Sequence, residues 1–428
     1  MENFTGFYNH LEKLISFRSV KQSAKKDMPF GEGVYRAYEF FMNLAKEFGF
    51  TTINYDNYIG EIVLGEGQEL GIIGHLDVVP EGSGWNTDPY KMTLIGDTLY
   101  ARGLCDDKAP MLLLLYILKE LKDSGIKLTK KIRFIVGCDE ESDWQDIEYF
   151  KTKSTFPKYG ISPDGNFPVS YAEKGINKII FTLPTLKNFY DIKGGTVFNA
   201  VCGYCTCKAT NQGINKELLK KYGLNLIEGN VIESIGKSCH GSKPELGKNA
   251  IEPLFKYFLE MGENVSSVVD NLFLDKLGLK KISTPQGTVT FSPNIISESE
   301  EKITIECDCR VPAPKTLDDL IKYFDKFNLE YKAIMHRAPL YVSKDSPLVK
   351  TLLSTYTEIT GEKATPISQS GGTFAYVFEK GCAFGPEFEN QPSSIHEANE
   401  RISLSSLETL YNIYKKAIFS LATSKDFE

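Results

Sequence analysis

The stretch LGIIGHLDVVP, residues 70–80, decides the fold class of this chain. It begins as a short apolar run, typical of a strand buried in a sheet, and it ends as a loop that carries a histidine and an aspartate. His75 and Asp77 are two residues apart, so on an extended backbone their side chains point the same way. This spacing suits an imidazole that binds a metal ion and a carboxylate that holds the imidazole in place.

Two further strand-like segments end in acidic clusters. The strand predicted at Leu99–Ala101 leads into RGLCDDK, residues 102–108, and the strand predicted at Lys131–Val136 leads into GCDEES, residues 137–142. Any one of these clusters alone is typical of a solvated loop. Because open α/β sheets bind ligands beyond the carboxyl ends of their strands, the three clusters together predict one site. Carboxylates and imidazoles suit zinc, manganese or cobalt better than a metal that prefers thiolates.

Helical spacing over Val34–Phe48 and an apolar run over Ala109–Lys122 predict helices between these strands. Strands that alternate with helices indicate an α/β fold with a mostly parallel central sheet. Strand-like runs dominate the middle of the chain, and the first texture returns after Pro339. We therefore expect a discontinuous α/β domain over residues 1–175 and 339–428, and an inserted α+β domain over residues 176–338.

Charge and composition exclude several classes of function. The 49 basic and 56 acidic side chains give a net charge of −7 without a basic run, which argues against a nucleic-acid partner. The N-terminus lacks the pattern of a signal peptide, and the longest apolar run, Met111–Leu118, is too short to cross a bilayer. Nine cysteines without a disulfide-like pattern indicate a reducing compartment. We expect a cytoplasmic protein without a membrane partner.

Five of the cysteines fall into two groups. Cys202, Cys205 and Cys207 form one group, and Cys307 and Cys309 form the other. Closely spaced thiolates are the usual ligands of structural zinc. Residues two apart on a strand lie on one face, however, and unpaired cysteine is among the most buried residue types. We therefore expect these thiols to pack in a core.

The motifs GHLDVVP, ARGLCDDK, DEES, SPDGNFPV, HGSKPELGKNA, DCRVP and SGGT occur in this order, followed by His396. In this set the chain resembles the two-metal exopeptidases related to aminoacylase, carnosinase and the glutamate-releasing carboxypeptidases. It is most similar to the branch of bacterial Xaa-His dipeptidases with an enlarged lid. The resemblance covers nearly the whole chain. It departs from the pattern at Ala109, where the family usually has Gly, and at Gly241, where it often has Ala.

The resemblance implies a zinc-exopeptidase-like catalytic domain that holds two divalent metal ions per chain, zinc first and manganese or cobalt as alternatives. Asp106 would bridge the two ions, and the peptide bond after it would be cis. Glu140 would be the general base, with Asp77 behind His75. The adjacent residues Glu140 and Glu141 are expected to point in opposite directions. The implied metal ligands are His75, Asp106, Glu141, Asp164 and His396.

The inserted domain would act as a lid that supplies further residues. His240 would stabilise the developing oxyanion, and Arg310 would bind the substrate carboxylate. The resemblance implies that Arg310 is assisted by Asn199, Gly371, Gly372 and Thr373. His10 and His336 match no functional position and are expected to be surface or ordinary hydrogen-bonded histidines.

These residues together predict a metal-dependent dipeptidase for dipeptides with a free C-terminal carboxylate. An N-acyl amino acid deacylase, of the aminoacylase or desuccinylase type, would share the same metal residues. The inserted segment, about 160 residues and thus as long as a domain, favours a dipeptidase and a monomer over a dimer. A third possibility is an inactive relative that serves as a binding protein. The presence of every implied ligand and of Glu140 argues against it.

Overall fold

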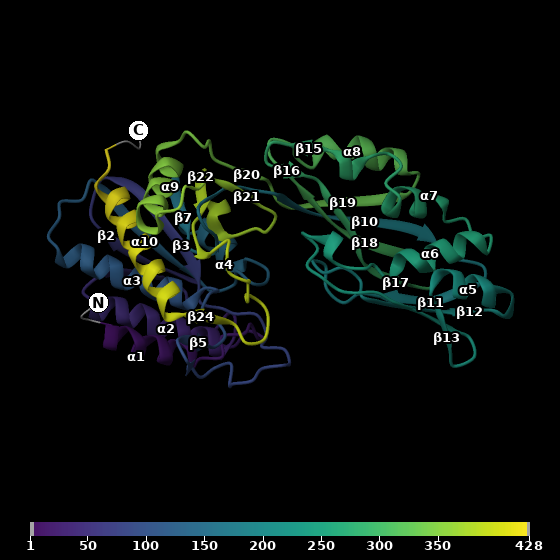
Figure 1. Cartoon of the computed structure of the whole chain (residues 1–428), viewed down its shortest axis with the longest axis horizontal. Helices are drawn as coiled ribbons and strands as arrows, with labels where there is room; N and C mark the ends of the chain where they lie inside the picture. Colours follow the sequence, from purple (N-terminus) through teal and green to yellow (C-terminus); the bar gives the residue numbers. More distant parts are fainter. Residues whose placement is uncertain (1–3, 426–428) are drawn as a thin grey trace. The chain divides into compact units, whose positions relative to one another are not determined.

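The computed structural model describes residues 4–425, which form two compact units (Figure 1). Unit 1 comprises Met1–Tyr171, Tyr341–Ile367 and Thr373–Glu428, so described segments from the first and last parts of the sequence fold together. Unit 2 comprises Ala172–Leu340 and the short segment Ser368–Gly372. The predicted fold class is confirmed, because one unit has a mostly parallel central sheet with helices and the other has a separate antiparallel sheet.

Unit 1 is built on a mixed sheet in which β6, β3, β7 and β22 are parallel neighbours. Both neighbours of β3 are parallel to it, and residues Leu70–His75 of this strand are all buried. A strand covered on both faces is expected to be apolar throughout, as the run LGII is. The strand order is β1 (Thr51–Tyr55), β2 (Ile59–Leu64), β6 (Lys130–Gly137), β3 (Gln68–His75), β7 (Tyr159–Ser162), β22 (Lys380–Ala383), β9 (Ser170–Glu173) and β20 (Leu340–Tyr341), with β21 (Ile367–Gln369) paired to β9.

Helices cover both faces of this sheet. Phe134 of β6 contacts Phe41 of one helix, whereas its neighbour Ile135 packs with Trp144 and Phe374 on the opposite face. Strand alternation thus gives each face its own core. The helices of unit 1 are α1 (Phe4–Ile15), α2 (Glu32–Glu47), α3 (Lys108–Asp123), α4 (Gln145–Lys151), α9 (Pro347–Thr360) and α10 (Leu404–Thr423), with the 3₁₀ turn η6 (Phe374–Val377).

One prediction about the central sheet is wrong. The strand expected at Leu99–Ala101 is β5 (Thr98–Tyr100), and it does not join the parallel sheet. It lies in a small antiparallel sheet between β4 (Thr93–Ile95) and β24 (Arg401–Ser403). A segment this short shows no periodicity that distinguishes a sheet strand from a hairpin strand. A second small pair, β8 (Gly165–Asn166) with β23 (Pro386–Glu387), is parallel.

Unit 2 has an eight-stranded antiparallel sheet covered by short helices. The strand order is β13 (Asn225–Ile227), β14 (Val231–Ile235), β12 (Tyr204–Ala209), β11 (Phe189–Gly194), β17 (Thr290–Glu298), β18 (Lys302–Val311), β10 (Gly175–Pro184) and β19 (Glu330–Arg337). The helices are α5 (Lys216–Tyr222), α6 (Ile251–Glu260), α7 (Ser266–Val268) and α8 (Asp318–Phe324), and β15 (Ser283–Thr284) pairs with β16 (Gly287–Thr288).

The grouped cysteines lie in the hydrophobic core of unit 2. Cys205 and Cys207 alternate inward on β12, and Cys307 and Cys309 do so on β18. With Cys202 they pack among aliphatic and aromatic side chains, so the core prediction for these thiols is confirmed.

Within residues 4–425, no helix is both long and apolar enough to span a membrane.

Candidate metal centre

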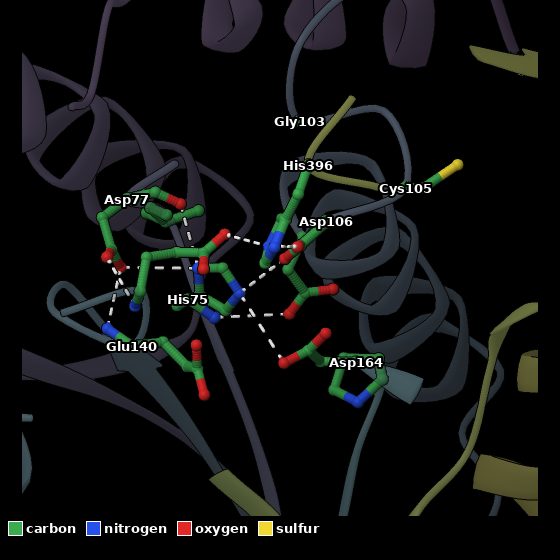
Figure 2. A network of polar contacts seen from close by, with 12 residues as sticks. His75, Asp77, Gly103, Cys105, Asp106, Glu140, Asp164 and His396 are labelled. Carbon is green, nitrogen blue, oxygen red and sulfur yellow. Dashed lines mark hydrogen bonds and ion pairs between the residues drawn. The ribbon is translucent and has the colours of Figure 1, made fainter. Parts of the chain in front are cut away.

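Acidic and imidazole side chains gather at one edge of the unit 1 sheet (Figure 2). His75 ends β3, Glu140 and Glu141 follow β6, and Asp164 follows β7. The carboxyl ends of these parallel strands meet at this edge because the strands are neighbours. Asp106 comes from the loop after β5 in the small antiparallel sheet, and His396 comes from the segment before β24.

Asp106 lies between the two histidines. Its Oδ1 is 2.9 Å from Nε2 of His75, and its Oδ2 is 2.8 Å from Nε2 of His396. Nε2 of His396 is also 2.9 Å from Oε1 of Glu141, and Nε2 of His75 is 3.8 Å from Oδ2 of Asp164. The structure therefore brings all five predicted ligands together, with one carboxylate facing an imidazole on each side. The peptide bond between Asp106 and Asp107 is cis.

Two sets of donor atoms within 4.8 Å of one another could each hold an ion. One set is His75, Asp106 and Glu141, and the other is His75, Glu140 and Asp164. Glu140 is thus close enough to the centre to act either as a ligand or on a water beside it.

The chemistry of these donors fits a divalent cation. Nε2 of His75 and Oδ1 of Asp106 are buried and only 2.9 Å apart, yet neither atom makes a hydrogen bond within the described part of the chain. Buried polar atoms are rarely left in this state unless they bind a metal ion or a ligand. Burial and the charge of Asp106 raise the pKa of Glu141 to about 7 and raise the pKa of Asp164 well above its usual range. A cation between these carboxylates would relieve the repulsion.

Asp77 holds both the imidazole and the loop of the two glutamates. Nδ1 of His75 donates to the backbone carbonyl of Asp77 at 2.9 Å, which leaves Nε2 as the atom that can bind a metal. The Asp77 carboxylate accepts from the backbone N–H of Glu140 at 3.2 Å and of Glu141 at 3.1 Å. Asp77 therefore lies behind His75, but its carboxylate mainly orients the adjacent glutamates.

Residues 71–420 match the model of peptidase family M20/M25/M40. The chain belongs to this family. The prediction drawn from the motifs is thereby confirmed, and the chain is a hydrolase of the M20 group.

Individual M20 proteins are similar to the chain over their full length. It is 31% identical to a Staphylococcus epidermidis protein named "Putative dipeptidase", over 96% of each chain. Its fold is similar to that of the aminopeptidase PepT from Bacillus cereus, with a TM-score of 0.62 at 14% identity, over 98% of this chain and 99% of that chain. The Bacillus subtilis YXEP protein, described as a dinuclear metal binding peptidase, has a TM-score of 0.54 at 10% identity, over 98% of this chain and 100% of that chain.

The other site residues expected in this M20 peptidase lie in unit 2, with the exception of Thr373. Arg310 is 3% exposed, and its Nε and Nη2 donate to Oδ1 and Oδ2 of Asp308 at 2.7 and 2.9 Å. The two residues are two apart on β18, on the face opposite the core thiols Cys307 and Cys309. Nη1 of Arg310 donates to the carbonyl of Ser370 at 3.4 Å, next to Gly371 and Gly372.

His240 and Asn199 are neighbours in the same cluster of unit 2. Nδ1 of His240 is 2.6 Å from Oγ of Ser242, and the carbonyl of Asn199 accepts from the N–H of Gly241 at 2.6 Å. A Cβ at Gly241 would lie 2.7 Å from Oδ2 of Asp308, so the glycine permits this close approach. Thr373 directly precedes η6 and caps it, since its Oγ1 accepts from the N–H of Ala375 at 3.1 Å.

Sequence reasoning missed the carboxylates that position the site residues. Oδ2 of Asp146 accepts from the N–H groups of Cys138 at 2.7 Å and Asp139 at 3.1 Å, directly before the two glutamates. Asp308 clamps Arg310, and Glu400 binds the loop of Asp106. Nothing in composition or periodicity identifies them. The only signals are that Asp308 lies in the motif DCRVP and that Asp146 and Glu400 lie within five residues of a predicted site residue.

Proposed function

We propose that this chain is a two-metal dipeptidase that hydrolyses dipeptides with a free C-terminal carboxylate. The observation that carries the proposal is Asp106, whose two oxygens each face the Nε2 atom of a different histidine. One carboxylate that faces an imidazole on each side is the arrangement needed to bridge two cations. The full-length relative named "Putative dipeptidase" supports this choice within the M20 family.

The residues around Asp106 divide the reaction into metal binding and proton transfer. Two bound cations would polarise the scissile carbonyl and lower the pKa of a water. His75, Asp106, Glu141, Asp164 and His396 would hold them, with zinc, manganese or cobalt as suitable ions. Glu140 takes the proton of the attacking water and delivers it to the leaving amine.

Arg310 is assigned to the substrate carboxylate. A guanidinium has five N–H donors, of which Asp308 accepts two and Ser370 accepts one. Two donors of this buried side chain are left without a partner among residues 4–425. A carboxylate is the group that a guanidinium binds best, because both are planar and opposite in charge. Asn199, Gly371, Gly372 and Thr373 are assigned to the same end of the substrate, and His240 to the oxyanion.

A substrate panel tests the proposal. Metal-loaded protein is assayed with dipeptides, C-terminally amidated dipeptides, tripeptides, N-acetyl amino acids and N-succinyl amino acids. We expect dipeptides to be cleaved fastest, with amidated dipeptides slow because the partner of Arg310 is gone, and tripeptides slow because the clamp fixes the distance to the scissile carbonyl. An N-acyl amino acid that outpaces every dipeptide would establish a deacylase instead.

A further inference from the structure

Glu400 is a fully buried carboxylate that the proposed reaction does not use. Its Oε1 accepts from the backbone N–H of Cys105 at 2.7 Å and from that of Asp106 at 3.3 Å. Its Oε2 accepts from the N–H of Gly103 at 3.0 Å. Gly103 has a φ of +89°, and a residue in this region turns nearby amides toward one side, where they form an anion-binding concavity. Three amides of one loop therefore converge on one carboxylate.

An arginine completes the environment of this carboxylate. Nη1 of Arg102 is 2.9 Å from Oε2 of Glu400, and both side chains are at most 1% exposed. The guanidinium is itself held, since Nη2 donates to the carbonyl of Pro80 at 3.4 Å and the group lies 5.3 Å from the Trp85 ring centroid. Buried charges are costly unless they are paired and hydrogen-bonded, and Glu400 meets both conditions. The three backbone N–H groups and the guanidinium of Arg102 together fix the orientation of the Glu400 carboxylate.

Glu400 joins the two segments that carry the bridging carboxylate and the exposed histidine. Asp106 follows β5 and donates its own N–H to Glu400, whereas His396 precedes Glu400 by four residues. β5 and β24 pair directly beside this contact, where the N–H of Ala101 donates to the carbonyl of Glu400 at 3.1 Å. Figure 2 shows Asp106 beside His396, with Gly103 and Cys105 in the loop that Glu400 binds.

We propose that Glu400 is a positioning residue for the metal centre, which sets the separation of Asp106 and His396 by clamping residues 103–106 to the segment of residues 396–400. The inference rests on the proposed metal binding at these two residues. Oδ2 of Asp106 and Nε2 of His396 are 2.8 Å apart, although the two residues are far apart in the sequence. The Glu400 clamp, beside the pairing of β5 with β24, is a short connection that keeps this distance when a cation enters or leaves. Partners that orient metal ligands typically contribute 10–100-fold to metal affinity.

The test is the Zn²⁺ affinity of Glu400→Gln in the full-length chain, measured by competition with a chromophoric chelator. The amide replaces one acceptor oxygen with an NH₂ group, which opposes either the loop amides or Arg102. We expect at least one of the Zn²⁺ equivalents to bind about 10–100-fold more weakly. The absorption spectrum of the Co²⁺-loaded variant is expected to differ from wild type, because the coordination geometry changes. Glu400→Asp, which keeps the charge on a shorter stem, should recover part of the affinity.

A matched control separates positioning from general stability. Glu61 is 2% exposed and forms two hydrogen bonds with the buried Arg133, at 2.5 and 2.9 Å. Glu61 lies on β2 and Arg133 on β6, and neither strand contains a proposed metal ligand within its bounds. Glu61→Gln should lower the free energy of unfolding of metal-free protein as Glu400→Gln does, yet bind Zn²⁺ with wild-type affinity.

The possible results distinguish the positioning role of Glu400 from the proposed function. Folded Glu400→Gln with wild-type Zn²⁺ affinity, or equal affinity losses in Glu400→Gln and Glu61→Gln, overturns the positioning role and leaves the proposed function standing. Wild-type protein that binds no Zn²⁺, Mn²⁺ or Co²⁺ overturns the proposed function itself. If Glu400→Gln does not fold, Arg102→Lys replaces it, since it keeps the carboxylate and removes the fork that orients it. Wild-type Zn²⁺ affinity in that variant would equally overturn the positioning role.

Discussion

Asp106 and Glu400 are both buried carboxylates, but their partners differ in kind. Glu400 meets three amides and a guanidinium, so all of its acceptor positions face donors of the protein. Asp106 faces two imidazoles, and its Oδ1 has no hydrogen-bond partner in the described part of the chain. A buried carboxylate saturated by backbone donors orients the backbone, whereas one that faces imidazole nitrogens is suited to hold a cation. Asp77 and Asp146 belong to the first kind, whereas the carboxylate of Asp308 accepts from the guanidinium of Arg310 and orients that side chain.

Replacing Glu140 and Glu141 by Gln, one at a time, should have different effects on metal binding and on kcat. Oε1 of Glu141 contacts His396, whereas Glu140 groups with His75 and Asp164. We expect Glu141→Gln to weaken metal binding, and Glu140→Gln to retain two metals while kcat falls by about 10²–10⁴, the range for loss of a general base. Elemental analysis and steady-state kinetics on the same preparations check this. Equal metal loss in both variants would make Glu140 a ligand.

Arg310→Lys tests the carboxylate clamp. The lysine keeps the positive charge but cannot bind Asp308 and a substrate carboxylate at the same time through a planar fork. Loss of a charge-assisted hydrogen bond of about 1.5–3 kcal/mol should lower kcat/KM for dipeptides roughly 10–100-fold. C-terminally amidated dipeptides are the internal control, because the variant and the wild type should cleave them at similar rates. A similar loss for both substrate classes would remove Arg310 from carboxylate binding.

At the scale of elements, the parallel strands of unit 1 are held against η6 through two glycines. A Cβ at Gly71 of β3 would lie 2.2 Å from Cε1 of Phe378, and one at Gly160 of β7 would lie 2.4 Å from Cε2 of the same ring. Phe378 directly follows η6 and packs in the cluster that contains Ile73 and Ile135. The ring can reach the sheet only because these two positions have no side chain.

Gly71→Ala is therefore expected to be destabilising through overpacking, by about 1–3 kcal/mol in the free energy of unfolding. Phe378→Leu makes room, so the double variant should be more stable than the sum of the two single changes predicts. Denaturant unfolding of the four proteins checks the coupling. Gly6→Ala on α1 is the control, because its Cβ meets nothing closer than 3.4 Å and alanine favours a helix. Strict additivity of Gly71→Ala and Phe378→Leu would show that the ring does not set the strand position.

At the scale of the whole molecule, the metal centre belongs to one unit and the thiol core to the other. All five proposed ligands lie in unit 1, as do both tryptophans, Trp85 and Trp144. The core of unit 2 contains the five grouped cysteines. Tryptophan fluorescence therefore reports on unit 1, and the reactivity of the five grouped thiols reports on the opening of unit 2.

Metal removal should act on unit 1 alone. An ion that binds only the folded state stabilises it by about 4 kcal/mol at 1,000 times its Kd. We expect chelation to abolish hydrolysis and to lower the denaturant midpoint seen by tryptophan fluorescence, while the midpoint for labelling of the unit 2 thiols stays unchanged. Zinc, manganese or cobalt should restore both activity and the first midpoint. Full activity in protein shown by elemental analysis to be metal-free would refute the two-metal assignment.

The sequence by itself determined the fold class, the family and the order of the motifs that contain the proposed metal ligands. Apolar runs that end in histidine or acidic residues are local patterns, and helical periodicity placed α2 and α3 to within about two residues. Such patterns are visible without a structure because each depends on neighbours a few positions away.

Only the tertiary structure decided that β5 pairs with β24 outside the parallel sheet, and that Glu400, Asp308 and Asp146 hold the site residues. Glu400 and Cys105 are 295 positions apart in the chain. A buried carboxylate must be satisfied by donors, but its own sequence neighbourhood does not show which backbone amides will reach it. That choice is made when the loops before β24 and after β5 pack together, because the hydrogen bonds form between backbone groups that every residue type except proline carries.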